Sequence, residues 1–151
     1  MADAAFPAHN ELDWLIRRFV EENPQIEQAV VVSSDGVLLA HDGALDETGR
    51  SRIAAVTAGI AALAASCAEL SGGGGLRRTL VELGQGCLLV CHLTDGALLA
   101  VHASEGCDLA LLGYQSARLA RRAGAALTPA PRGGGQYAAL PPGIEPVREP
   151  R

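Results

Sequence analysis

The chain has 151 residues, a length that suits one domain with a terminal extension and that allows a core to form without metal ions or disulfides. All twelve basic residues are arginine and the formal net charge is -5, which argues against a broad nucleic-acid surface. Although 48% of the residues are hydrophobic, the chain has only one Trp, two Tyr and two Phe, so we expect a core of Ala, Val, Leu and Ile.

The cysteines and the longest apolar run both favour a protein of the cytoplasm. Four cysteines in a chain without an apolar N-terminal signal segment indicate a reducing compartment. The longest uncharged run, residues 53–68, is half alanine and is shorter than the roughly 20 strongly apolar residues of a membrane span. We therefore expect a buried helix there and no insertion into a membrane.

An amphipathic helix is the first predicted element. Asn10, followed three residues later by Asp13, resembles a capping box, and apolar residues then recur at helical spacing as far as Val20. Pro24 ends the helix, because a proline disfavours helical geometry at the residue before it. Residues 1–9 are expected to be a flexible N-terminus.

A β-hairpin follows, with strands over residues 29–32 and 37–40. Asp35-Gly36 between them is a strong hairpin signal, because a type I′ turn needs positive φ at both central residues. Residues 93–100 repeat the pattern of Asp-Gly followed by an apolar strand, so a second hairpin is expected there.

A long helix is predicted over residues 46–71, with a run of glycines just past its end. One side carries a continuous apolar stripe formed by Ile53, Val56, Ile60, Leu63, Cys67 and Leu70. The opposite side carries small residues, Ala54, Ala58, Ala61 and Ala65. We expect the stripe to lie on a sheet and the alanine side to approach another helix closely.

Three more strands are predicted, over residues 79–83, 87–93 and 97–103. The last two are almost wholly apolar, which is typical of strands with both faces covered, so helices are expected above and below the sheet.

A third helix and a tail complete the chain. Ser104 is the expected N-cap and Gly124 the expected stop, with arginines near the negative C-terminal end of the helix. Six of the eight prolines lie beyond residue 125, and residues 126–151 are expected to form a disordered tail.

Cys87, Cys91 and His92 have a spacing that could suggest zinc. Residues four apart on a strand lie about 13 Å from each other, whereas two thiolates on one zinc must lie within about 5 Å and a disulfide needs Cα atoms closer than about 7 Å. Buried free thiols are therefore the preferred interpretation. If Asp95-Gly96 forms a two-residue loop, His92 and His102 fall on opposite faces of the sheet and cannot share a metal ion.

No segment predicts catalysis or cofactor binding. The glycines after Ser71 follow a helix and the chain has no Lys, so they do not form a phosphate-binding loop. Arg50 and Arg52, with Arg77 and Arg78, could in principle steady phosphate charge for a GTPase, but a solvated surface or a non-catalytic partner contact is favoured. We expect no catalytic residue, no metal and no cofactor.

Several segments together resemble a known family. They are Leu12-Asp13-Trp14-Leu15, residues 29–40, residues 53–64, Thr79-Leu80-Val81-Glu82 and residues 99–103. In this order they resemble the roadblock/LC7 proteins, especially the small ones encoded beside Ras-like GTPases in bacterial conservon operons. The resemblance covers about residues 10–127. One departure is Asp108-Leu109-Ala110, where the family often has Asp-Leu-Gly.

The resemblance implies a profilin-like α/β domain over residues 10–125, in the order α-β-β-α-β-β-β-α, with a five-stranded antiparallel sheet and helices on both faces. It implies a cytoplasmic homodimer in which the third strands and long helices of two chains meet. The expected self-association residues are Ala54, Ala58, Ala61, Ala65, Thr79, Leu80 and Val81. It also implies a non-enzymatic adaptor or regulator of a small Ras-like GTPase and associated sensor-kinase-like proteins, with Arg50 and Arg52 as candidate partner contacts.

Two other functions are weighed against this one. A small-molecule sensor module of profilin-like fold would need a sizeable pocket, which a dense alanine-rich core disfavours. A thiol or zinc enzyme would need a cysteine of low pKa or a bound metal.

Overall fold

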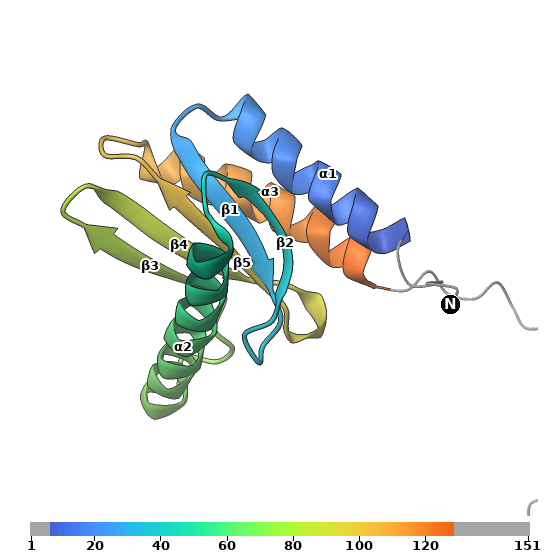
Figure 1. The fold of residues 1–151 in the computed structure, drawn as a ribbon. Helices are drawn as coiled ribbons and strands as arrows, with labels where there is room; N and C mark the ends of the chain where they lie inside the picture. The colour runs from blue at the N-terminus through green and yellow to red at the C-terminus, as the bar shows by residue number, and fades with distance from the viewer. Residues whose placement is uncertain (1–6, 129–151) are drawn as a thin grey trace, which may run out of the picture.

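A computed structural model describes residues 7–128 of the chain, and it confirms the predicted order of helices and strands (Figure 1). The elements are α1 (Pro7–Glu22), β1 (Ile26–Val32), β2 (Leu38–Gly43), α2 (Glu47–Ser71), β3 (Arg78–Leu83), β4 (Gly86–His92), the short 3-10 turn η1 (Thr94–Gly96), β5 (Leu98–Ala103) and α3 (Leu109–Leu127).

The strands form one antiparallel sheet in the order β2-β1-β5-β4-β3, so β2 and β3 are its two edges. Helices α1 and α3 lie side by side on one face, and α2 lies on the other (Figure 1). The expectation of helices on both faces is therefore confirmed. Its physical basis is that the central strands are apolar on both sides and need cover on both.

Alternate residues of the strands belong to two separate hydrophobic cores, one on each face of the sheet. On the α1 and α3 face, Val31, Leu89, Leu99 and Val101 pack against helical residues that include Phe19. The core on the α2 face contains Val30, Val32, Leu88, Val90, Leu98 and Ala100 together with Ala54 and Ala61. This division follows from the two-residue period of a β-strand.

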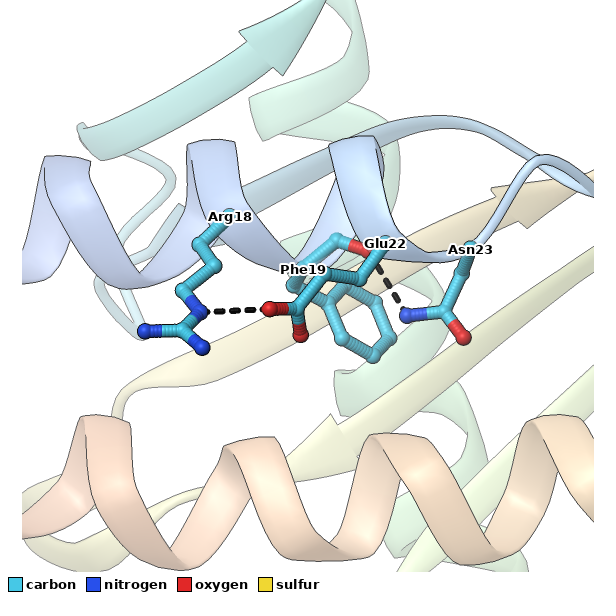
Figure 2. A network of polar contacts seen from close by, with 4 residues as sticks. All are labelled: Arg18, Phe19, Glu22 and Asn23. Carbon is cyan, nitrogen blue, oxygen red and sulfur yellow. Dashed lines mark hydrogen bonds and ion pairs between the residues drawn. The ribbon is translucent and has the colours of Figure 1, made fainter.

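Helix α1 begins three residues before the predicted start. It begins at Pro7, and proline suits the first helical position because its φ is already helical and its missing N–H would have no partner there. Asn10 is therefore inside the helix and not its cap. The helix ends at Glu22 as predicted, where the Asn23 side chain donates to the carbonyl of Phe19 at 2.7 Å (Figure 2).

Both hairpins have three-residue loops rather than the predicted two-residue type I′ turn. In the first, the N–H of Gly36 donates to the carbonyl of Ser33 at 3.0 Å, and Gly36 has a φ of 87°. In the second, Leu93 pairs with Ala97 across residues 94–96. This geometry is a turn closed by a glycine in left-handed conformation, the other common way to connect two strands.

The longer second loop changes the register of β4 against β5. Leu88 faces His102 and His92 faces Leu98, so both histidines lie on the α2 face of the sheet, and the predicted placement on opposite faces is wrong. Four residue positions along the strands still separate the two rings, a distance of about 13 Å that prevents shared ligation.

Helix α3 differs from its prediction at both ends. Its N-cap is Asp108, which accepts from the N–H groups of Ala110 and Leu111, whereas Ser104 donates to the carbonyl of Gln25 at 3.1 Å. Gly124 does not stop the helix but lies buried within it. Thr94 donates to the Gly124 carbonyl at 3.2 Å, and a Cβ at this glycine would lie 2.8 Å from the same hydroxyl oxygen. The helix therefore includes the first residues of the predicted tail, and residues 129–151 lie outside the described part.

Candidate protein-interaction surface

Only part of the predicted stripe of α2 lies on the sheet: Ile53 and Ile60 pack against the core on that face, whereas Val56, Leu63 and Leu70 are exposed. Ala54, Thr57 and Ala61 face the sheet and are 1%, 0% and 5% exposed. The sheet presents bulky Val and Leu side chains to them, so small residues on the helix allow its backbone to approach closely. Ala54 and Ala61 are thus buried in the core of their own chain, and the prediction that they contact another chain is wrong.

The outer stripe of α2, defined as Val56, Leu63 and Leu70, is left in solvent. These side chains are 49%, 76% and 91% exposed and follow one another at intervals of seven residues along the helix. The C-terminal half of α2 projects away from the sheet in Figure 1, and no residue of α2 after Ala61 is buried. An exposed apolar stripe of this kind is a candidate association surface.

Helix α2 is long and apolar enough to cross a membrane by length and composition. It is not the buried helix that its sequence predicts, since only three of its residues are buried. Its first turns nevertheless lie on the sheet, and it connects β2 to β3, which belong to the same sheet. A helix whose two ends are fixed to one sheet cannot place them on opposite sides of a bilayer.

The open edge of β3 lies next to α2. Strand β3 pairs with β4 alone, so the N–H and C=O groups of its other edge have no strand partner in the described part of the chain. Leu80 is 44% exposed, while Thr79 and Val81 are half-buried on the α2 face of the sheet. The predicted residues of β3 are therefore available at an edge.

The two remaining alanines of the predicted set lie at the margin of the contact between α2 and the sheet. Ala58 and Ala65 are both half-buried. Ala58 lies beside the first hairpin, 3.7 Å from the place where a Cβ on Gly36 would stand. They can touch a partner only through their exposed fraction.

The two arginine pairs named in the sequence do not come together. Arg50 donates to the Leu45 carbonyl at 3.1 Å and lies 2.9 Å from the Nε2 of His41 on β2, so its guanidinium is used to brace the start of α2. Arg52 is exposed. Arg77 and Arg78 lie at the start of β3, which is the opposite edge of the sheet from β2.

The cysteines of β4 have the properties of structural thiols. Burial raises the pKa of Cys91 to about 11, with the nearby Arg78 offsetting part of the effect. Burial also raises the pKa of Cys87 to about 11, assisted by a hydrogen bond with Cys107. A nucleophilic thiol requires the opposite shift, so these two cysteines are poor candidates for thiol catalysis. Residues 7–128 contain no group of three or more His, Cys, Asp or Glu side chains placed to hold a metal ion.

A groove between α1 and α3 was not anticipated from the sequence. It has a volume of about 220 Å³ and is lined by Leu15, Arg18, Phe19, Glu22, Asn23, Gln115, Arg118, Leu119 and Arg122. Figure 2 shows Arg18, Glu22 and Asn23 on the side of α1 that is turned toward α3. Trp14 and Tyr114 do not line this groove, but each lies four residues before one of its arginines, Arg18 and Arg118.

Fold and surfaces together define a small α/β domain with a five-stranded antiparallel sheet, an exposed apolar helix and, next to it, the open edge of β3. The chain belongs to the Roadblock/LC7 domain family, whose sequence profile matches residues 12–103. The predicted resemblance and fold are confirmed.

Solved structures agree with this assignment. The Roadblock/LC7 domain from Streptomyces avermitilis has 35% sequence identity and a TM-score of 0.68, over 73% of this chain and 92% of that one. The gliding protein MglB from Thermus thermophilus has 19% identity and a TM-score of 0.71, over 83% and 93%. A structure of MglB with tetrameric arrangement has 19% identity and a TM-score of 0.72, over 83% and 92%. A comparison with curated proteins found no significant match.

Proposed function

We propose that the protein is a homodimeric adaptor or regulator that binds a small Ras-like GTPase in a bacterial signalling system. The single observation that carries self-association is the outer stripe of α2, where Leu63 and Leu70 are 76% and 91% exposed. Burying such a side chain contributes about 1.5 to 3 kcal/mol of free energy, so we expect these exposed side chains to be covered by a second copy of the chain.

Two copies can satisfy both exposed features at once. If the β3 edges pair, the backbone groups left open in one chain meet those of the next, and the sheet continues across two chains. The outer stripes of the two α2 helices then lie on the same face of that shared sheet. In this proposed interface β3 contributes Thr79, Leu80 and Val81. Helix α2 contributes its outer stripe in place of the predicted Ala54 and Ala61. One MglB structure has a tetrameric arrangement, which is a reason to test self-association in this chain.

The GTPase and its associated sensor-kinase-like proteins are proposed as partners on the strength of family membership. The raised pKa values of Cys87 and Cys91 disfavour thiol catalysis by these two residues. Arg52 is the better of the two predicted partner contacts, because Arg50 is engaged within the chain. A cytoplasmic location follows from such a partner.

The test is a binding experiment with the small GTPase encoded nearest to this gene, loaded with GDP or with a non-hydrolysable GTP analogue. The proposal expects binding that differs between the two nucleotide states and that weakens in Arg52→Glu. Arg17→Glu, an exposed arginine of α1, is the matched control and should leave binding unchanged. Absence of binding in both nucleotide states would refute the proposal for that GTPase, and equal weakening by both variants would refute the role of Arg52.

A further inference from the structure

The chain has few aromatic residues, and some of them lie on the surface instead of in the core. Its single Trp and one of its two Tyr, Trp14 on α1 and Tyr114 on α3, are 48% and 61% exposed. Leu111, 43% exposed, lies one turn before Tyr114 on the same helix. Trp, Tyr and Arg are the residues most enriched where proteins bind one another.

Each exposed aromatic ring carries an arginine four residues further along its helix. The guanidinium carbon of Arg18 lies 5.3 Å from the centre of the Trp14 ring, and that of Arg118 lies 5.8 Å from the centre of the Tyr114 ring. These stacked pairs hold large flat groups in place before any partner arrives, which lowers the entropic cost of binding.

The positive charge on α3 has no explanation within the described chain. Arg18 forms an ion pair with Glu22 (Figure 2), but Arg118 and Arg122 form none with any residue from 7 to 128. Helix α3 contains no acidic residue, and its last turn contains no basic one. The arginines therefore lie too far from the C-terminus of the helix to be accounted for by its dipole.

The groove beside these arginines is lined by apolar as well as charged groups. Leu15, Phe19 and Leu119 line it together with Arg118 and Arg122. A segment bound there can therefore make apolar contacts and ion pairs at the same time.

We propose that the face formed by α1 and α3 binds an acidic segment of a partner protein that also carries apolar side chains. Its carboxylates pair with Arg118 and Arg122, and its apolar groups cover Trp14, Leu111 and Tyr114. Charge complementarity selects this occupant, because the chain is acidic overall yet gathers arginines here that form no ion pair among residues 7–128.

This surface lies on the opposite face of the sheet from the outer stripe of α2. Helices α1 and α3 cover one face and α2 covers the other (Figure 1). The β3 edge, by contrast, borders α3, because Arg78 donates to the Gly113 carbonyl at 3.3 Å. Only the contact through the outer stripe is therefore separate from this surface.

Trp14 makes the test direct, because it is the single tryptophan of the chain and belongs to the proposed face. The full chain is titrated with a synthetic amphipathic peptide made of Glu and Leu at helical spacing, and with the same peptide carrying Lys in place of Glu. We expect the Glu peptide to shift Trp14 emission to shorter wavelength and the Lys peptide to bind roughly tenfold more weakly or not at all. Arg118→Glu should weaken the Glu peptide roughly fivefold or more, and Arg118→Lys should restore much of the loss.

Arg77→Glu, which makes the same charge change at an exposed position just before β3, is the matched control and should bind like the wild type. Circular dichroism shows whether each variant is folded. Equal binding of the two peptides, or binding that leaves Trp14 emission unchanged, would overturn the proposal. A shift of Trp14 emission produced by anionic phospholipid vesicles but not by the Glu peptide would also overturn the proposal, because it identifies a membrane surface as the occupant. A shift of Trp14 emission caused by deleting residues 129–151 would overturn it too, because it identifies the chain's own C-terminal segment as the occupant.

Discussion

The Sγ atoms of Cys87 and Cys107 lie 3.7 Å apart, which joins β4 to the loop that precedes α3. Cys87 is buried, and its pKa is raised to about 11 by burial first and by the hydrogen bond with Cys107 second. Cys91, further along the same face of β4, has its pKa raised to about 11 by burial. Cys67 on α2, by contrast, is exposed. These differences lead to the first two predictions.

Iodoacetamide at pH 8 should modify Cys67 well before Cys87 or Cys91. With a pKa of about 11, only about 0.1% of a buried thiol is ionised at pH 8, and only the thiolate reacts. Mass spectrometry of tryptic peptides after short exposure measures the order, and Cys67→Ser should remove the fast reaction. Rapid native labelling of Cys91 would show that β4 opens or that its thiol is not buried.

The same thiols predict a loss of stability in alkaline solution. Their pKa is about 11 in the folded chain against 9.0 for a free cysteine, so the folded state retains protons that the unfolded state releases. The stabilisation is fully present below about pH 9 and is lost as the pH rises toward 11. Thermal denaturation across this range measures the slope, which should be smaller in Cys91→Ala. An identical slope in that variant would assign the effect to other groups.

Thr57→Val should stabilise the protein by about 1 kcal/mol. The Thr57 hydroxyl is completely buried against the sheet and has no hydrogen-bond partner among the described residues, and valine keeps the shape without the polar group. Chemical denaturation measures the free energy of unfolding. Thr48→Val, at an exposed position in the first turn of α2, should change it by less than about 0.5 kcal/mol. A destabilised Thr57→Val would mean that the hydroxyl is satisfied, for example by a buried water.

Gly86→Ala should destabilise the protein by at least about 2 kcal/mol. Gly86 has a φ of 104°, and a Cβ there would lie 2.2 Å from the backbone oxygen of Ala103 on β5. Gly84 occupies the same turn, and a Cβ there would have no atom within 4 Å, so Gly84→Ala is the control. Similar melting temperatures for the two variants would contradict the close approach of β4 and β5 at Gly86.

Leu63→Glu should convert the proposed dimer into a folded monomer. Leu63 is 76% exposed in the single chain, so a glutamate there costs the monomer little but would place charge in the middle of a contact between two α2 helices. Sedimentation equilibrium measures the mass. Leu111→Glu, on the opposite layer, should leave the mass unchanged, and a Leu63→Glu dimer would remove the outer stripe from the interface.

The amino-acid sequence alone determined the order of elements and the covering of the sheet on both faces. The alternation of apolar residues and the Asp-Gly turns act over a few residues, so they can be read locally. The apolar runs of β4 and β5 required helices on both sides because every second side chain points to the opposite face. The exposed edge residues of β3 could also be predicted, since the strand is short and follows a pair of arginines.

Only the tertiary structure decided which side of α2 faces the sheet, because both sides are apolar and periodicity cannot rank them. The side that faces the sheet combines Ala54 and Ala61 with Ile53 and Ile60, which pack against Val and Leu side chains of distant strands, while Leu63 stays exposed. The registers of the hairpins depend likewise on loop length, which moved His92 and His102 to one face. The face formed by α1 and α3 arises only when two helices separated by most of the chain pack together, because its charge and its groove belong to neither helix alone.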